Sequence, residues 1–570
     1  MKHRVRLGIG LWLFLSLLAG TAGCERRSTA PSAPARGGRL VVSQSSGPKT
    51  FNPLFATDTD TLAILNCIMS VLVRINRQTG EAEPELAESL SYSPDHTVLT
   101  IRLRKGVTFS DGHPLTADDV LFTFEVIYDP ALRSSLRDLL DVDGKKIVVE
   151  KRDPYTVTLT FPRPVAASER LLDSIHILPR HRLEADYRAG RFASLWDLST
   201  PPDQIVGVGP FRLKEYVPGE RTILVRNPHY WKRDPSGQPL PYLDEIILLI
   251  VPDRSTRVLK FQQGELDMLS PLTPDEVATL QPQVATNRIR IYDLGPSLIS
   301  EVMWFNLNPR ARSLSPTKLA WFQDTRFRQA VSYAINRQAL IDVVFAGKAA
   351  PVWGPVPATS RWFNPQVKTY PYDPDRAKAL LAEAGFSDRN GDGILEDRQG
   401  NRVTFTLMTN AGNAIRERMG LMIQEDLKKV GIGVTFAPIE TKTMLERIAR
   451  GTDYEAGLLA IAAGDTDPSS LRNFLLSSGA NHWWNPQQPR PATDWEKRVD
   501  ELLNEFLTAA DQKRRKALFD EVQMILSEQV PFIYLVARDL IVAAKPTVRN
   551  LKPGLLQDPL LWNAEELYLE

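Results

Sequence analysis

The chain is poor in the residues that build covalent or metal-based frameworks. Its 570 residues include 2 cysteines and 7 histidines. Two cysteines cannot form a disulfide framework. Among the histidines only His176 and His181 are close in sequence, and no His-Glu-x-x-His or Cys-x-x-Cys pattern accompanies them. We therefore expect no dedicated zinc site and no metal bound by the protein.

An excess of charge of one sign is also missing. The 69 Lys and Arg residues are balanced by 68 Asp and Glu residues, which leaves a net charge of +1. Without a basic excess the chain has little capacity to neutralise a phosphate backbone, so we expect no nucleic-acid partner. The length exceeds what one hydrophobic core supports, which predicts two or three domains.

The usual catalytic motifs are absent from the sequence. There is no Gly-x-Ser-x-Gly elbow, no Gly-x-x-x-x-Gly-Lys-Ser/Thr phosphate loop and no dinucleotide fingerprint after a strand. Acidic pairs such as Asp118 and Asp119 are better explained by the start of a helix than by acid–base chemistry. We expect a protein that is not an enzyme and that uses no cofactor.

One long apolar run is present, at the N-terminus. Residues 7–18 are almost wholly apolar and follow Lys2, Arg4 and Arg6. This length suits the h-region of a secretory signal and is short for a transmembrane helix. The run ends in Thr21-Ala22-Gly23-Cys24, which resembles the lipobox of bacterial lipoproteins.

This resemblance implies a signal peptide at 1–23, a lipid on Cys24 and a linker of Pro, Ser and Gly composition through residue 38. The protein is then periplasmic or displayed at the cell surface, anchored to a membrane by its lipid. The alternative is a plain secretory signal followed by an incidental cysteine. With Cys24 lipidated, Cys67 is expected to be a buried apolar thiol.

Periodicity in the mature chain predicts alternating strands and helices. Leu99, Ile101 and Leu103 alternate with polar residues as in a half-buried strand. Thr116 begins a capping box, and Asp373-Pro374 with Gly385 delimit a helix. Residues 403–407, 415–430 and 434–436 read as strand, helix and strand, which indicates a βαβ unit of an α/β domain.

A loop at 388–399 begins like an EF-hand. Asp388, Asn390 and Asp392 alternate with Gly391 and Gly393, but the twelfth position holds Gln399 instead of a bidentate Glu. Asn-Gly and Asp-Gly are also common turn dipeptides. We expect a polar turn; a weak Ca²⁺ site is the alternative.

Residues 84–125 contain several motifs in a fixed order. Pro-x-Leu-Ala-x-Ser is followed by Leu-Arg-x-Gly-Val-x-Phe-x-Asp-Gly and then by Thr-Ala-x-Asp-Val-x-Phe. Gly207-Val-Gly-Pro-Phe211 and Arg226-Asn-Pro-His-Tyr-Trp231 come later. This series resembles the family 5 extracellular solute-binding proteins, the oligopeptide-, dipeptide- and nickel-binding components of ABC importers. The resemblance runs from about residue 39 to residue 550.

The resemblance implies an α/β, two-lobe periplasmic binding protein fold of type II, in the large three-domain form, with a ligand cleft between the lobes. Lobe I is expected to be discontinuous, with an inserted domain II and a lobe II (domain III) between its segments. The expected ranges are 39–58, 200–300 and 531–570 for lobe I, 59–199 for domain II and 301–530 for lobe II.

In peptide binders of this family an aspartate before an Asp/Glu-Pro pair holds the α-ammonium group of the ligand. The corresponding residues are Asp465 and the pair Asp467-Pro468. Only Thr466 separates them, where the family has two residues, and the segment could equally form a turn. Further predicted ligand contacts are Trp304, Asn306, Trp353, Asn410, Arg416 and Trp484. Among these, Arg416 could pair with a ligand carboxylate.

The predicted function is therefore capture of a small solute, a di- or oligopeptide, and its delivery to an ABC permease in the inner membrane. The protein is expected to act as a monomer. Alternatives within the same fold are a nickel chelate, an opine, haem or an oligosaccharide as ligand, or a role as a ligand sensor.

Overall fold

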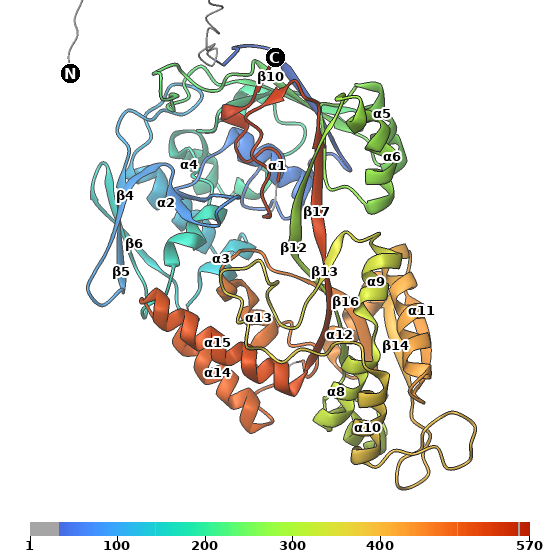
Figure 1. Cartoon of the computed structure of the whole chain (residues 1–570). Coiled ribbons are helices and arrows are strands. Elements are labelled where there is room, and N and C mark those ends of the chain that lie inside the picture. The colour runs from blue at the N-terminus through green and yellow to red at the C-terminus, as the bar shows by residue number, and fades with distance from the viewer. Residues whose placement is uncertain (1–33, 143, 487, 557–558) are drawn as a thin grey trace, which may run out of the picture.

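The computed structural model describes residues 34–142, 144–486, 488–556 and 559–570. The predicted signal peptide and Cys24 lie outside these residues. Figure 1 shows an upper body and a lower body, with two long strands, β12 (Arg290–Phe305) and β17 (Phe532–Ala544), running between them. We call the upper body lobe I together with the inserted region, and the lower body lobe II.

Lobe I is built on a four-stranded sheet in the order β1-β10-β9-β8. The first strand pairs in parallel with β10, and alternate residues of the strand, such as Leu40 and Val42, are buried. The elements of this lobe are β1 (Arg39–Gln44), β8 (Phe211–Val217), β9 (Arg221–Arg226), β10 (Glu245–Ile250), α5 (Arg254–Gln263), β11 (Met268–Leu269), α6 (Pro274–Ala285), β18 (Val548–Arg549), η5 (Ala564–Glu566) and β19 (Tyr568–Leu569).

The inserted region lies between β1 and β8 and contains an antiparallel sheet in the order β4-β5-β7-β6. Its elements are α1 (Thr59–Ile68), β2 (Val73–Ile75), β3 (Ala82–Pro84), β4 (Ala87–Tyr92), β5 (Val98–Leu103), α2 (Ala117–Tyr128), α3 (Ser135–Leu140), β6 (Val148–Asp153), β7 (Thr156–Thr160), η1 (Ser168–Ser174), α4 (Arg180–Arg188), η2 (Phe192–Ser194) and η3 (Pro202–Gln204). One hydrophobic cluster spans this region and lobe I, so the two share a core.

Two glycines explain how closely the inserted region packs on lobe I. A Cβ at Gly207 would lie 1.9 Å from the carbonyl oxygen of Ile68, and one at Gly209 would lie 2.5 Å from that of Cys67. The backbone before β8 therefore touches the end of α1 at a distance that no side chain tolerates. Cys67 itself is buried, as predicted.

Lobe II is built on most of a seven-stranded sheet, whose main path β11-β17-β12-β16-β14-β15 begins at β11 of lobe I and has β13 beside β17. Its other elements are α7 (Pro316–Gln323), α8 (Thr325–Ala334), α9 (Arg337–Val344), β13 (Ala349–Pro351), α10 (Pro374–Ala384), β14 (Thr404–Asn410), α11 (Ala414–Lys428), β15 (Gly433–Ile439), α12 (Thr441–Arg450), β16 (Ala456–Ala462), η4 (Pro468–Leu471), α13 (Arg472–Leu475), α14 (Asp494–Phe506) and α15 (Gln512–Gln529). Its core extends from Val302 to Ala537.

The predicted local elements are confirmed. Residues 99–103 lie in β5, and Thr116 closes a capping box at the start of α2. Helix α10 begins after the cap Asp373 and ends at Gly385, whose φ of 98° suits glycine. Strands β14 and β15 are parallel and are connected by α11, which completes the predicted βαβ unit.

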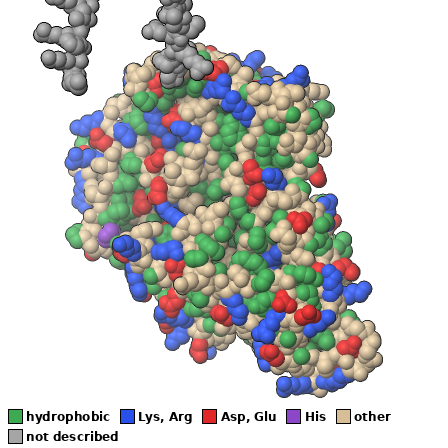
Figure 2. Space-filling model, in the orientation of Figure 1, with side chains coloured by type: hydrophobic (Ala, Val, Ile, Leu, Met, Phe, Trp, Pro, Cys, Tyr) green, Lys and Arg blue, Asp and Glu red, His purple; other side chains and the backbone are tan. Residues whose placement is uncertain are grey.

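The charge on the surface is mixed, and the helices bear on membrane spanning. Basic and acidic side chains are interspersed over the face shown in Figure 2, in keeping with the balanced composition. Within the part of the chain that the structure describes, no helix combines the length and the apolar character needed to cross a bilayer.

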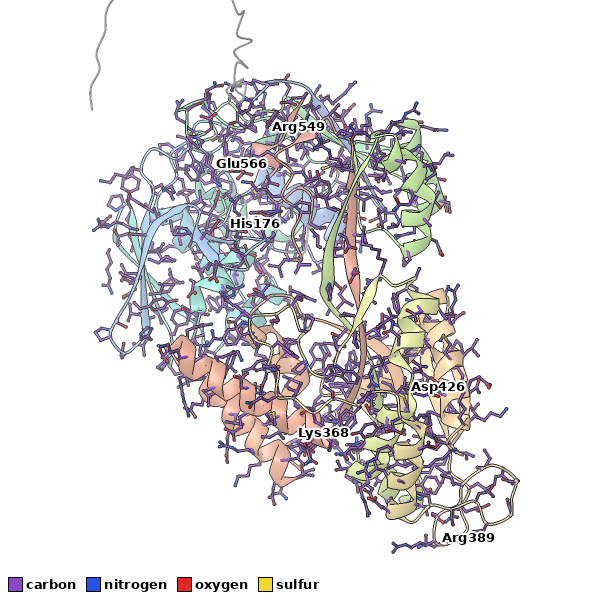
Figure 3. The ribbon with its side chains drawn as sticks, viewed as in Figure 1. His176, Lys368, Arg389, Asp426, Arg549 and Glu566 are labelled. Carbon is purple, nitrogen blue, oxygen red and sulfur yellow. The ribbon has the colours of Figure 1, made fainter. Side chains whose placement is uncertain are left out.

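One buried histidine makes folding sensitive to acid. His176 is 7% exposed, and its Nε2 lies 3.1 Å from Oδ1 of Asn66. It lies inside the upper body in Figure 3. Burial lowers the pKa of His176 from 6.5 to about 4. The unfolded chain thus takes up a proton near pH 6.5 that the folded chain takes up only near pH 4.

We therefore predict that the free energy of unfolding falls as the pH drops from 6.5 to 4, by roughly 3 kcal/mol from this group, at about 1.4 kcal/mol per pH unit. Urea unfolding of His176→Gln should show a shallower pH dependence in that window than the wild type. The exposed His229 provides the control variant, His229→Gln. An unchanged slope in His176→Gln would contradict the prediction.

Candidate functional site

A cavity of about 550 Å³ lies where the two lobes meet. From lobe I and the inserted region it is lined by residues 42–45 at the end of β1, and by Thr59, Asp60 and Ala63 of α1. From the strands between the bodies and from lobe II it is lined by 297–299 and 462–464. This volume is in the range of small-ligand sites, which occur preferentially at domain interfaces.

Most of the cavity wall is apolar. Leucines from several segments contribute, and the C-terminal segment closes one side. The leucines are Leu248, Leu298, Leu540, Leu555, Leu556, Leu560 and Leu561. A wall of this kind can accept varied apolar groups, while the polar groups between the leucines fix the orientation of what is bound.

Two strand edges face the cavity. In β1, Val41 exchanges hydrogen bonds with Asp267 on the side away from β10: its N–H donates to Oδ2 at 2.7 Å, and its carbonyl accepts from the Asp267 N–H at 2.8 Å. Main-chain groups two residues apart point the same way, so those of the cavity-lining Ser43 also point away from β10.

The same reasoning applies to β16. The N–H of Ala463 donates to the carbonyl of Leu298 in β12 at 3.0 Å, whereas the carbonyl of Leu458 accepts from Oγ1 of Thr409 on the other side of the strand. By alternation the main-chain groups of Ala462, which lines the cavity, point away from β12.

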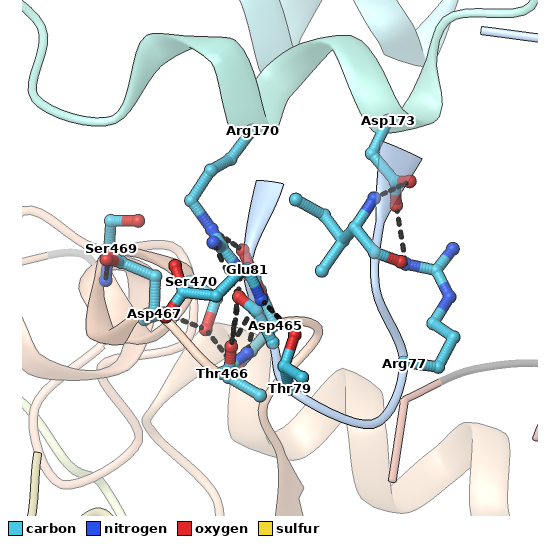
Figure 4. Close-up of polar contacts among 12 residues, drawn as sticks. Arg77, Thr79, Glu81, Arg170, Asp173, Asp465, Thr466, Asp467, Ser469 and Ser470 are labelled. Atoms are coloured by element: carbon cyan, nitrogen blue, oxygen red, sulfur yellow. Dashed lines mark hydrogen bonds and ion pairs between the residues drawn. The ribbon is translucent and has the colours of Figure 1, made fainter. Parts of the chain in front are cut away.

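The predicted ammonium anchor, Asp465, is engaged by an arginine of the inserted region. Arg170, in η1, donates from Nε to Oδ2 of Asp465 at 2.5 Å and from Nη2 to Oδ1, a bidentate ion pair visible in Figure 4. Its Nη1 donates to the carbonyl of Gly80 at 2.8 Å, and its Nη2 also contacts Oγ1 of Thr466 at 3.2 Å.

Both partners of this pair are largely enclosed. The Arg170 side chain is 7% exposed and that of Asp465 is 21% exposed. Burial by itself would lower the pKa of Arg170, but the hydrogen bonds and charge of Asp465 outweigh burial and raise it. The ion pair joins the inserted region to lobe II next to Gly464, which lines the cavity.

The second predicted acid, Asp467, has a role inside lobe II. Its side chain is 1% exposed and receives 2.9 Å hydrogen bonds from Nη1 and Nη2 of Arg515. It also caps η4 by accepting from the N–H of Ser469 at 3.0 Å. Burial tends to raise the pKa of Asp467, but Arg515 outweighs it and lowers the pKa.

Three other predicted contact residues lie in the core of lobe II. Trp304, Asn306 and Trp484 are each 0% exposed. The Trp304 ring packs 4.9 Å from that of Trp483, and Nδ2 of Asn306 donates to the carbonyls of Gly451 and Tyr454. Nε1 of Trp484 donates to Glu496 at 3.0 Å. These three side chains pack and form hydrogen bonds inside lobe II, and they do not line the cavity.

The remaining three predicted residues are also engaged within lobe II. Arg416 donates from Nε to Oε2 of Glu301 and from Nη1 to Oδ1 of Asn410, both at 2.9 Å. Trp353 is partly buried, and the guanidinium of Arg337 stacks on its ring at 4.5 Å. The structure therefore brings Asn410 and Arg416 together, but as partners of each other.

The loop at 388–399 is held by hydrogen bonds from main-chain N–H groups to its own aspartates. Oδ1 and Oδ2 of Asp388 accept from the N–H groups of Gly391 and Gly393 at 2.7 and 3.0 Å. Carboxylate oxygens of Asp388, Asp392 and Glu396 lie within 4.8 Å of one another. Figure 3 places the neighbouring Arg389 at the far tip of the lower body, well away from the junction of the lobes.

Sequence reasoning missed the charged residues that do line the cavity, Asp60 and Arg257. Asp60 Oδ2 accepts from Oγ of Ser45 and from the N–H and Oγ of Ser46, at 2.7 to 2.8 Å. The sequence does set Arg257 apart: it follows Arg254 in the first turns of α5, where the helix dipole disfavours positive charge. A basic residue at such a position is a candidate for binding an anion.

The Arg170–Asp465 pair yields a prediction about closure. Arg170→Met and Asp465→Asn should each shift the unliganded protein toward a more open form, because each removes a largely buried ion pair between the bodies. Small-angle X-ray scattering should show a larger radius of gyration for either variant, and no further increase in the double variant.

A second cross-body pair supplies the control. Arg361 of lobe II pairs with Glu81 of the inserted region, but the two side chains are 41% and 58% exposed. Exposed pairs contribute little, so Arg361→Met should leave the scattering curve nearly unchanged. An equal increase in the radius of gyration in all three single variants would show that the Arg170–Asp465 pair contributes no more to closure than the exposed pair.

Comparison with known proteins places this geometry in a family. Residues 81–483 match the family described as bacterial extracellular solute-binding proteins, family 5 middle. The chain is 31% identical over 512 residues to a "Probable ABC transporter-binding protein" of Deinococcus radiodurans, covering 86% of this chain and 85% of that one. It is 28% identical to the oligopeptide-binding protein AppA of Bacillus subtilis, covering 98% and 97%.

The fold is shared as well. The solved structure of Bacillus subtilis AppA in complex with a nonapeptide superposes with a TM-score of 0.70 at 27% identity, covering 94% of this chain and 100% of that one. The predicted two-lobe, type II periplasmic binding protein fold is confirmed by this likeness.

Proposed function

Because the chain belongs to the bacterial extracellular solute-binding proteins of family 5, we propose that it captures a di- or oligopeptide in the interlobe cavity and delivers it to the permease of an ABC importer. The observation that carries the proposal is the cavity of about 550 Å³ with a strand edge on either side, at Ser43 and at Ala462.

A peptide suits this cavity better than a compact solute does. An extended chain can add its main-chain groups to an exposed strand edge, which gives affinity without dependence on sequence. The apolar wall then accepts side chains of different size. The name of the relative AppA and the nonapeptide in its solved structure support the same ligand class.

The way the bodies are joined supports the proposed delivery. The lobe II core and the core shared by lobe I and the inserted region are separate clusters, linked through β12 and β17. Such a connection permits a hinge motion that closes the cavity around a ligand. A closed, liganded form is a shape that a permease can distinguish from the open form. The protein performs this task as a monomer and without catalysis.

The ligand class is tested by native mass spectrometry of the protein from Glu25 onward, purified without unfolding. We expect bound masses that disappear on denaturation and that fragment as peptides. A haem, a nickel chelate, an opine or an oligosaccharide in their place would contradict the proposal. If the protein is recovered empty, thermal-shift titration with a peptide library should raise the melting temperature.

The role of Asp465 is decided by two variants. If Asp465 holds the ligand's α-ammonium group, Asp465→Asn loses peptide affinity by orders of magnitude, and Arg170→Met, which frees the carboxylate, does not. If Asp465 serves only to hold Arg170, both variants weaken binding equally. We expect the first pattern in isothermal titration, since a desolvated ammonium group requires a carboxylate.

Anchoring at a membrane surface is tested at Cys24. The proposed lipoprotein should incorporate labelled palmitate and partition into the detergent phase of Triton X-114. Cys24→Ser should abolish both and release the protein in soluble form, whereas Cys67→Ser should change neither, since Cys67 is 1% exposed. Labelling that persists in Cys24→Ser would contradict the lipid anchor.

A further inference from the structure

Three polar atoms in the cavity wall have no partner among the described residues. They are Oε1 of Gln44, Oγ of Ser270 and Nε of Arg257, and each is buried without a hydrogen bond. A buried polar group that is left unpaired is costly, so groups of this kind gathered in one cavity indicate a missing partner.

The surroundings of Arg257 indicate the charge of the missing partner. It is the one basic residue among the described residues that line the cavity, and no ion pair of the described residues includes it. The neighbouring Arg254 is satisfied instead, by Glu276 of α6 at 2.5 Å and by the carbonyl of Pro271. Within the part of the chain that the structure describes, no carboxylate lies at ion-pair distance from Arg257.

The charges near Arg257 do not supply a contact partner. Burial, followed by the charge of Arg254, lowers the pKa of Arg257, against the weaker opposing effects of Glu276, Asp60 and Asp253. Asp60 is the acid that shares the cavity, and one of its oxygens already accepts from Ser45 and Ser46. An anionic group brought by the ligand would therefore be the contact partner of Arg257.

We propose that Arg257 and Ser270 bind the C-terminal carboxylate of the peptide and that Oε1 of Gln44 accepts an N–H from its last residue. A guanidinium fork and a hydroxyl are donors that match a carboxylate, and an amide oxygen matches a peptide N–H. Nε2 of Gln44 donates to the carbonyl of Asp60 at 2.7 Å, which holds the amide group in place and leaves Oε1 without a partner among the described residues. This assignment rests on the proposed function.

The test compares a mixed library of tri- to pentapeptides in two forms, with a C-terminal carboxylate and with a C-terminal amide. Native mass spectrometry should show that the wild type prefers the free acids by roughly ten- to a hundredfold, the effect of a charge-assisted hydrogen-bonded contact. Arg257→Gln should lose this preference, because its affinity for the free acids falls to about its affinity for the amides. Arg257→Lys, which keeps the charge without the fork, should lie between them.

A matched control lies on the same helix. Lys260→Gln removes the same charge from α5, but Lys260 pairs with Glu265 and does not line the cavity, so the preference should remain. Melting curves of all variants establish that they are folded.

The outcomes separate the inference from the proposed function. Peptides that bind equally well as acids and amides, or a preference that survives in Arg257→Gln, would overturn the carboxylate site alone. If binding requires an acidic side chain of the peptide instead of its C-terminal carboxylate, and Arg257→Gln removes that requirement, Arg257 binds a side chain. That result would overturn the assignment to the C-terminal carboxylate. A wild type that takes up neither library would overturn the proposed function, and the assignment with it.

Discussion

The pairing of β12 with β17 is the interaction on which the rest of the structure depends. The two strands run antiparallel from Arg290 opposite Ala544 to Trp304 opposite Phe532, and so contribute to both bodies. Their register shifts between Asp293 and Ser300. Irregular pairing of this kind bends a strand, and residues 297–299 in this stretch line the cavity. The junction of the bodies and the cavity are therefore produced by the same irregular stretch.

The arginines around this junction differ in whether they have a carboxylate partner. Arg515 forms an ion pair with Asp467 inside lobe II, and Arg416 forms one with Glu301. Arg170 of the inserted region pairs with Asp465 of lobe II. Arg257 finds no carboxylate at contact distance among the described residues and faces the cavity. Because Gly464 lines the cavity and Asp465 is the next residue, a bound ligand and the contact that joins the bodies act on the same short loop.

Local elements of the fold could be read from the sequence because their causes are local. The capping box at Thr116, the cap and stop of α10 and the βαβ unit around α11 depend on residues within a few positions of one another. The site could not be read in this way. Trp304, Asn306 and Trp484 have the side chains of a ligand pocket, yet they are 0% exposed, because distant aromatic residues enclose them.

By itself, the sequence determined the alternation of elements and the family resemblance that covers nearly the whole mature chain. That resemblance implied Asp465 as a ligand contact. Only the tertiary structure decided which groups are free to act at the junction of the bodies. Arg170 and Asp465 are far apart in the chain but pair with each other. Arg257 is separated from Asp60 and Gln44 in the chain by most of the inserted region and by strands β8 to β10, and still shares a cavity with them. Ion pairing depends on distance in space, and a single sequence does not specify which of its many opposite charges will meet.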